Sequence, residues 1–249
     1  MARRPPNNVK TAAAQPTWSS PFWVIRQLAK ALVKLLSAVF LVIVFTVFAL
    51  KWINPPTTYL MMATWLDYGE VDYRWLDLDD MSPNIPLAVA AAEDANFCAH
   101  NGFDFEAIEA ALDEDSGRGA STISQQVAKN VFLWPSRSWA RKGLEVGFTV
   151  LIEAIWGKRR IMEVYLNVAE TGTATFGVDA AIYRHFNGNA LNLSLNDAAR
   201  IAVALPNPQE RNISRLSNQL KRRASRVAIG GSTLREEGRA DCFLNQPSP

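Results

Sequence analysis

The chain of 249 residues has little histidine and little cysteine, with two residues of each. Catalysis by several histidines is therefore excluded, and no group of His and Cys residues has the spacing of a metal site. The sequence also lacks a glycine-rich phosphate loop, a dinucleotide-binding fingerprint and a Ser-His-Asp pattern. The formal net charge of +2 is too small, and the basic residues too dispersed, to favour nucleic acid as a partner.

Acidic residues are absent before Asp67, and the N-terminal segment is basic. Between Lys34 and Lys51 lies an apolar run of 16 residues, which the three residues before Lys34 extend. A bilayer core needs about 20 helical residues, and lysines can snorkel to its edges, so a transmembrane anchor is predicted at 31–53. A cleaved signal peptide is the alternative, but no convincing small-x-small cleavage site follows the run.

The charge asymmetry also predicts the orientation of the anchor. Basic residues remain on the cytoplasmic side, so residues 1–22 are predicted to be a disordered cytoplasmic tail and everything after residue 53 lies outside. Residues 54–245 have the length of one domain. Helical periodicity recurs and strand-like alternation is scarce, which predicts an all-α domain. The predicted helices are 84–99, 105–113, 122–133, 140–156, 158–168, 177–186, 195–205 and 214–227.

The first motif that indicates chemistry follows the apolar run 87–92. Glu93, Phe97 and His100 have the spacing of one helix face, and Gly102 is predicted to end that helix. A partly desolvated glutamate has a raised pKa, which suits a general base. An acidic helical turn with a packed Phe and a hydrogen-bonded His explains the motif by itself equally well.

A second motif begins at Gly119. Thr122 and Gln125 have the spacing of a capping box, which predicts the start of a helix with a buried stripe of apolar residues. Free N–H groups at this helix start, the hydroxyl groups of Ser121 and Thr122, and Lys129 one turn later would form an anion site. An ordinary capped amphipathic helix is the alternative.

A third motif contains Arg137, Arg141, Lys142 and Glu145. Arg141 and Glu145 have the spacing of a surface salt bridge, whereas together with Lys129 the four cations suit a pyrophosphate. Two interpretations are open for the nearby Phe132, Leu133, Trp134 and Trp139, namely burial in the core and contact with lipid. The next basic segment begins at Lys158. The apolar helix face that follows is interpreted as core, and Glu163 as structural. This face comprises Ile161, Val164, Tyr165 and Val168.

Taken together, the motifs resemble the peptidoglycan glycosyltransferases of family fifty-one, in particular the monofunctional biosynthetic transglycosylases. The similarity covers about residues 54–210, and five blocks occur in the family's order. They are Glu93–Asp104, Gly119–Asn130, Arg141–Glu145, Lys158–Gly172 and Ala198–Pro208. Met162 stands where Leu is usual, and Cys98 is uncommon. The chain leaves no room for a transpeptidase domain after the fifth block, so transglycosylation alone is expected.

The resemblance implies a lysozyme-like α fold with a small membrane-facing jaw. It also implies polymerisation of lipid II into β-1,4 glycan strands with inversion and release of undecaprenyl pyrophosphate. Glu93 would be the general base, and Glu145 a second catalytic carboxylate that orients cations or the leaving group. Lys129 and Arg137 would hold the donor pyrophosphate. The remaining substrate-binding residues would be Asp94, Ser121, Thr122, Gln125, Gln126, Asn130, Arg141, Lys142 and Asn167.

The expected location is the bacterial inner membrane, with the catalytic domain in the periplasm. The expected partners are lipid II, the growing glycan strand, membrane lipid and proteins of division or elongation. No cofactor or protein metal site is expected, although a divalent cation on the substrate pyrophosphate is compatible with the reaction. An oxidising compartment allows a disulfide between Cys98 and Cys242, but the sequence does not show that they meet, and free thiols are the favoured interpretation.

Two other functions fit parts of the pattern. A muramidase-like hydrolase also uses carboxylates on a lysozyme-like fold, but a neutral glycan offers no phosphate to the cations that precede Glu145. A membrane-tethered scaffold without catalysis would need neither Glu93 nor Lys129.

Overall fold

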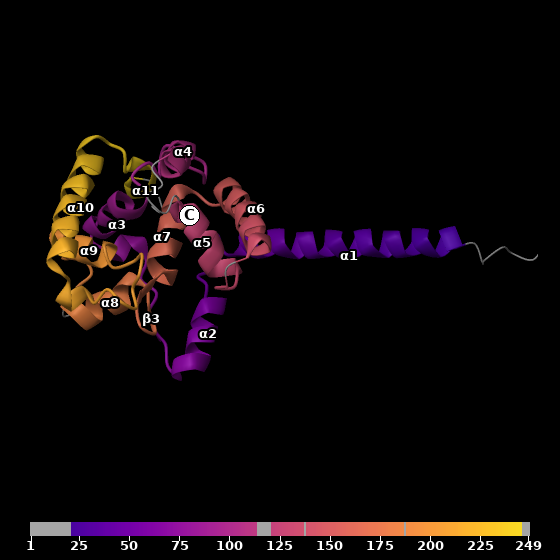
Figure 1. The fold of residues 1–249 in the computed structure, drawn as a ribbon, viewed down its shortest axis with the longest axis horizontal. Coiled ribbons are helices and arrows are strands. Elements are labelled where there is room, and N and C mark those ends of the chain that lie inside the picture. The colour runs from indigo at the N-terminus through magenta and orange to yellow at the C-terminus, as the bar shows by residue number, and fades with distance from the viewer. Residues whose placement is uncertain (1–20, 114–120, 137, 187, 246–249) are drawn as a thin grey trace, which may run out of the picture. The chain divides into compact units, whose positions relative to one another are not determined.

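The computed structural model describes residues 21–113, 121–136, 138–186 and 188–245. The chain divides into two compact parts, residues 1–45 and 46–249. The α-helices are α1 (Pro21–Ala49), α2 (Tyr59–Tyr68), α3 (Asn84–Glu93), α4 (Phe105–Asp113), α5 (Ile123–Phe132), α6 (Trp139–Ile155), α7 (Lys158–Val168), α8 (Val178–Phe186), α9 (Leu195–Ala202), α10 (Asn218–Glu236) and α11 (Asp241–Leu244) (Figure 1). Strands β1 (Asp72–Tyr73), β2 (Glu170–Gly172) and β3 (Thr175–Phe176) and the 3-10 helices η1 (Leu78–Asp80) and η2 (Ile213–Arg215) complete the list. The predicted all-α class is confirmed.

Helix α1 has 29 residues, and its stretch Phe22–Ala49 has the length and composition of a membrane-spanning helix. At 1.5 Å per residue the helix is about 43 Å long, more than the roughly 30 Å of a hydrocarbon core. It begins at Pro21, whereas the predicted anchor begins at residue 31. Proline suits the first position of a helix, and the residues after it continue the apolar pattern. This helix is consistent with a single-pass membrane anchor.

Two side chains of the globular part bind the backbone just after residue 45. The indole Nε1 of Trp156 donates to the carbonyl of Val47 at 2.7 Å. The guanidinium of Arg160 donates to the carbonyls of Leu50 and Ile53 at 3.0 and 3.1 Å. These bonds satisfy carbonyl groups that the end of α1 leaves without a helical partner.

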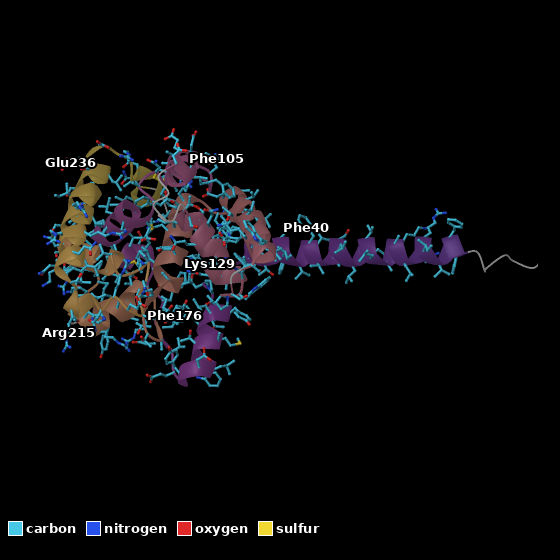
Figure 2. All side chains as sticks on the ribbon, in the orientation of Figure 1. Phe40, Phe105, Lys129, Phe176, Arg215 and Glu236 are labelled. Carbon is cyan, nitrogen blue, oxygen red and sulfur yellow. A yellow bond between two sulfur atoms is a disulfide. The ribbon has the colours of Figure 1, made fainter. Side chains whose placement is uncertain are left out.

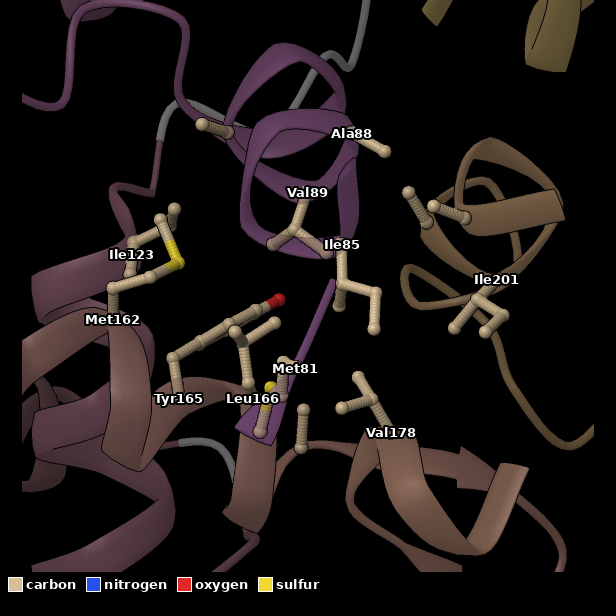
Figure 3. Packing of buried hydrophobic residues seen from close by; sticks show 14 of the residues in the cluster. Met81, Ile85, Ala88, Val89, Ile123, Met162, Tyr165, Leu166, Val178 and Ile201 are labelled. Carbon is tan, nitrogen blue, oxygen red and sulfur yellow. The ribbon is translucent and has the colours of Figure 1, made fainter. Parts of the chain in front are cut away.

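Helix α7 is the centre of the core. Nine of its 11 residues are buried, so it is enclosed on nearly all sides. The predicted core face from Ile161 to Val168 is buried, as expected. Figure 3 shows Tyr165 and Leu166 of α7 pointing toward Ile85 of α3. Helix α5 packs against α6 and α7, and α10 packs against α3 and α9. The C-terminal end of α3 lies where these groups of helices meet, because Gln126 of α5 donates a hydrogen bond to Glu93.

A three-stranded sheet, which the sequence did not predict, has the order β1-β3-β2. Strand β3 pairs in parallel with β1 and antiparallel with β2. Gly177 follows β3 with a φ of 83°, and a Cβ there would lie 2.8 Å from the carbonyl oxygen of Asn167. Glycine is therefore required where the chain passes from the sheet into α8.

The helix predicted at 84–99 is wrong in its second half. Helix α3 ends at Glu93, and Asp94 has a φ of −161° and a ψ of 74°. The Asp94 carboxylate accepts hydrogen bonds from the backbone N–H of Ile123 and from His100, at 2.9 Å each. These bonds to distant groups stabilise the chain in a loop, so Phe97 and His100 do not continue the helix face of Glu93.

The interpretation of free thiols is also wrong, because Cys98 and Cys242 form a disulfide. Their Cα atoms are 5.7 Å apart, although they are separated by 144 residues in the sequence. Phe243 packs near Phe97, with 6.0 Å between ring centroids, and its carbonyl accepts a hydrogen bond from Arg159 at 3.0 Å. Helix α10 and the turn after it return the chain to the loop that follows Glu93.

Candidate active site

Glu93 is the last residue of α3, and its carboxylate is held from one side. The Nε2 of Gln126 donates to Glu93 Oε2 at 3.0 Å. The hydroxyl of Tyr165 donates to Gln126 Oε1 at 3.2 Å, which fixes the amide so that its NH₂ group faces Glu93. Since Tyr165 is buried in α7, the core itself orients the carboxylate. No protein hydrogen bond to the other oxygen, Oε1, is found within the described residues.

The surroundings of Glu93 favour its protonated form. Burial is the largest effect and raises its pKa above the ordinary 4.5. The hydrogen bond from Gln126 and the charges of Arg223 and Arg211 lower the pKa, and the charge of Asp94 raises it. A raised pKa with a fixed orientation is what a general base requires.

Asp94 connects the end of α3 to the start of α5. Its Oδ2 accepts from the N–H of Ile123, and its Oδ1 is 2.9 Å from Nε2 of His100. The other ring nitrogen of His100 accepts from the N–H of Gly102 at 3.1 Å, which assigns the ring proton to Nε2. Asp94 therefore holds the start of α5 and the ring of His100 in place, and its contact with substrate stays a prediction.

The same hydrogen bonds bear on metal binding. Ligand atoms of Asp94, His100 and Asp104 lie within 4.8 Å of one another. The imidazole, however, has one nitrogen bonded to an N–H and the other protonated, so no lone pair faces the two carboxylates. In this arrangement the three residues form a hydrogen-bonded cluster.

The predicted capping box at the start of α5 is confirmed. Thr122 Oγ1 accepts from the N–H of Gln125 at 3.2 Å, and Gln125 Oε1 accepts from the N–H of Thr122 at 3.1 Å. The Thr122 hydroxyl also donates to the carbonyl of Gly102 at 2.7 Å. The predicted anion site at this helix start is wrong in one respect, because the anion bound to the N–H of Ile123 is the carboxylate of Asp94.

A cavity of about 310 Å³ lies beside Glu93. It is formed by the end of α3, the loop after it and the start of α5. Its lining residues are Ala91, Ala92, Glu93, Asp94, Ala95, Asn96, Asp104, Ala107, Ser121 and Thr122. Ser121 is exposed there, so its hydroxyl is accessible to a ligand. A second cavity of about 470 Å³ shares Asn96 and Asp104 with the first and extends the space toward α4.

Lys129 is half-buried on α5, near the middle of the globular part (Figure 2). Burial lowers the pKa of its ammonium group, and the charges of Glu145 and Glu93 raise that pKa. The charge of Lys129 in turn lowers the pKa of Glu170. Lys129 therefore lies among three carboxylates, one of which is the candidate base.

Glu145 binds two of the predicted cations. Its oxygens are 2.7 Å from Arg141 Nη1 and 2.5 Å from Lys142 Nζ. The side chain of Glu145 is only 4% exposed, so this is a buried carboxylate and not the surface pair that the spacing allowed. Glu145 thus compensates part of the charge of Arg141 and Lys142, whereas Lys129 has no ion pair within the described residues and lies within the electrostatic influence of Glu145 and Glu93. Arg137 lies outside the described residues.

Five of the predicted substrate contacts are buried, namely Asp94, Thr122, Gln125, Asn130 and Asn167. Asn167 is 0% exposed; its amide donates to the carbonyls of Leu76 and Glu163 and accepts from the N–H of Leu76. These bonds fix the backbone before η1, and the substrate contact of Asn167 stays a prediction. Gln125 and Asn130 are buried within α5. Glu163 is structural, as interpreted, and binds Arg160 and the N–H of Leu78.

The apolar residues around α6 divide between the two interpretations. Leu133 is buried, and Phe132 stacks on Phe148 with 4.5 Å between ring centroids, so these two belong to the core. Trp139 is 92% exposed. Sequence reasoning missed Tyr165 as part of the site because its spacing indicated core, and missed Arg211 and Arg223 because they lie far from Glu93 along the chain.

Comparisons with known proteins agree on one family. A family model described as Transglycosylase matches residues 61–232. The biosynthetic peptidoglycan transglycosylase of Rhodospirillum centenum is 44% identical over 228 residues, which cover 89% of this chain and 98% of the relative. That of Caulobacter vibrioides is 44% identical over 225 residues, covering 87% and 98%, and that of Jannaschia sp. is 46% identical over 190 residues, covering 76% and 80%. The chain belongs to the transglycosylase family.

Proposed function

We propose that this chain is a peptidoglycan glycosyltransferase that polymerises lipid II into β-1,4 glycan strands, with inversion and release of undecaprenyl pyrophosphate. The relatives that carry the name biosynthetic peptidoglycan transglycosylase match it over most of its length. The observation that supports the chemistry best is the buried carboxylate of Glu93, held by Gln126 at the edge of a cavity.

The proposed step begins at the carboxylate of Glu93. Because Gln126 occupies Oε2, Oε1 is free to accept the proton of the 4-hydroxyl of the acceptor GlcNAc. The acceptor oxygen then forms its bond to C1 of the donor MurNAc, on the face opposite the pyrophosphate. The bond from C1 to the pyrophosphate breaks, and the leaving oxygen takes the electron pair. Attack from the opposite face inverts the configuration and gives the β linkage.

Cations near the leaving group would stabilise its developing charge. Lys129 is placed for this role, and Arg137 is proposed to share it. Glu145 would act by holding Arg141 and Lys142 in position. The reaction as proposed needs no protein-bound cofactor, and any divalent cation would be bound by the pyrophosphate of the substrate.

The proposed location is the inner membrane, with the N-terminus in the cytoplasm and the catalytic domain in the periplasm. The basic segment before α1 and the acidic residues after it support this orientation. The disulfide supports an oxidising compartment outside the cytoplasm. Exposed apolar side chains on α2 and α6, among them Trp65 and Trp139, are proposed to contact lipid in the membrane-facing jaw. Proteins of division or elongation are proposed as further partners.

Incubation of the purified chain with labelled lipid II in detergent tests the proposed function. We expect a polymer that lysozyme digests, because lysozyme cleaves the β-1,4 bonds of peptidoglycan. The same protein incubated with pre-formed peptidoglycan should release no soluble fragments. Solubilisation of peptidoglycan without polymerisation of lipid II would instead favour a muramidase-like hydrolase.

The pH dependence of polymerisation should report the pKa of Glu93. The base must be ionised, so the rate should fall as the pH falls through a pKa above 4.5. The charge of Arg223 lowers this pKa, so Arg223→Gln should move the acidic limb of the profile to higher pH. Arg222→Gln is the matched control, since Arg222 is exposed and is not among the groups that shift Glu93. Equal shifts in both variants would contradict this origin of the limb.

A further inference from the structure

A groove on α10 continues from the cavity of Glu93. One cavity of about 450 Å³ is lined by Ala91, Gln219, Arg223, Arg226 and Val227. An adjoining cavity of about 310 Å³ shares Gln219, Arg223 and Arg226 and adds Arg211, Ser217 and Leu220. Since Ala91 also lines the cavity of Glu93, the three spaces follow one another around the end of α3.

This arginine groove (Arg211, Arg223 and Arg226 with Gln219) is held against the candidate base by helix packing. A Cβ on Gly230 would lie 3.4 Å from the Cβ of Ala91, so the two helices approach closely just beside the groove. Positions 219, 223, 226 and 230 share one face of α10. The groove therefore opens beside Glu93 on the side of α10, whereas Gln126 of α5 holds Glu93 from another side.

The groove carries positive charge, and within the described residues its arginines form no ion pair with an acidic side chain. Among the described residues, neither Arg223 nor Arg226 forms an ion pair or a hydrogen bond with a protein group. Arg211 donates to the carbonyl of Val203 at 2.9 Å, which leaves its charge intact. Elsewhere on the surface Arg200 and Arg239 pair with Asp197 and Glu237. Arginines that line a groove without an acidic partner suit an anionic ligand.

We propose that the arginine groove binds the carboxylates of the peptide that lipid II carries, and so positions the acceptor for Glu93. This inference rests on the proposed function and names the part of its substrate that this side of the site recognises. The disaccharide of lipid II is neutral, so its anionic groups are the pyrophosphate and the carboxylates of its peptide.

The position of the groove favours the peptide over the pyrophosphate. The pyrophosphate is attached to the lipid chain, so it stays near surfaces that face lipid. In the globular part, exposed large apolar side chains are most numerous on α2 and α6, whereas α10 has one, Ile229; α2 packs against α5. Figure 1 shows α10 at the edge opposite α6, and Figure 2 shows Arg215, just before α10, well apart from Lys129. A peptide that extends away from the lipid reaches this edge.

Arg226→Gln tests the proposal, with Arg222→Gln as its matched control. Arg226 lines both cavities of the groove and is not among the charges that act on Glu93, whereas Arg222 is exposed outside the groove. Polymerisation is measured with the full chain in detergent on lipid II with free peptide carboxylates and on lipid II with those carboxylates amidated. Arg226→Gln should lower kcat/KM between about threefold and tenfold on the first substrate only. Arg222→Gln should change neither rate.

An equal loss on both substrates, or no loss on either, would overturn the proposal and would leave the proposed function standing. A second measurement does not depend on turnover. In a Glu93→Gln background, binding of labelled lipid II should weaken by the same factor when Arg226→Gln is added, and binding of the amidated lipid II should not change. If the wild-type chain makes no polymer but this difference persists, the proposed function falls and the carboxylate site remains. An unchanged binding constant would overturn the site.

Discussion

Glu93→Gln should abolish nearly all polymerisation of lipid II while the fold remains intact. Loss of a general base lowers rates by about 10²- to 10⁴-fold, and a glutamine at this position cannot accept the proton of the acceptor hydroxyl. The amide oxygen can still accept the hydrogen bond from Gln126, so the local geometry should be retained. Initial rates with labelled lipid II measure the effect.

The stability of this variant separates catalysis from folding. The pKa of Glu93 is raised in the folded protein, so ionisation of this group at neutral pH reduces stability relative to lower pH. A neutral amide removes that cost, and the thermal unfolding midpoint at neutral pH should be unchanged or higher. Glu109→Gln, at an exposed position of α4, is the matched control and should keep full activity. Normal polymer from Glu93→Gln would overturn the role of the base.

Interactions between residues within one helix turn were predicted from the sequence, and contacts between distant segments were not. The capping box of Thr122 and Gln125 and the pairing of Arg141 with Glu145 both depend on spacings of three or four residues. The binding of Asp94 to the start of α5 depends on a loop that brings distant groups together. No local pattern encodes that contact, so the end of α3 was misplaced.

The bounds of the helices also depend on contacts that no local pattern encodes. Helix α10 was predicted to end at residue 227 but continues to Glu236, because Leu234 is buried against the rest of the domain. Helix α2 was missed because five of its large side chains are exposed, which leaves no amphipathic pattern. The three strands have two or three residues each, too few for alternation to be recognised.

Removal of the disulfide should destabilise the globular part strongly. The bond joins residues separated by 144 positions, and a crosslink over so long a loop restricts the unfolded chain greatly. A double variant with Cys98→Ser and Cys242→Ser should lose about 2–5 kcal/mol of unfolding free energy. Chemical denaturation of both proteins under oxidising conditions measures the difference, and a reducing agent should destabilise the wild type alone.

The same double variant should retain most of its polymerising activity at temperatures where it is folded. Neither the bond of Gln126 to Glu93 nor that of Asp94 to Ile123 involves the sulfur atoms, so the carboxylates keep their positions in the folded state. The disulfide then acts on the lifetime of the fold and not on the chemical step. Two titratable thiols in unfolded, unreduced wild-type protein would contradict the bond itself. A loss of rate in the folded double variant as large as that of Glu93→Gln would show that the loop after α3 needs the crosslink to place the base.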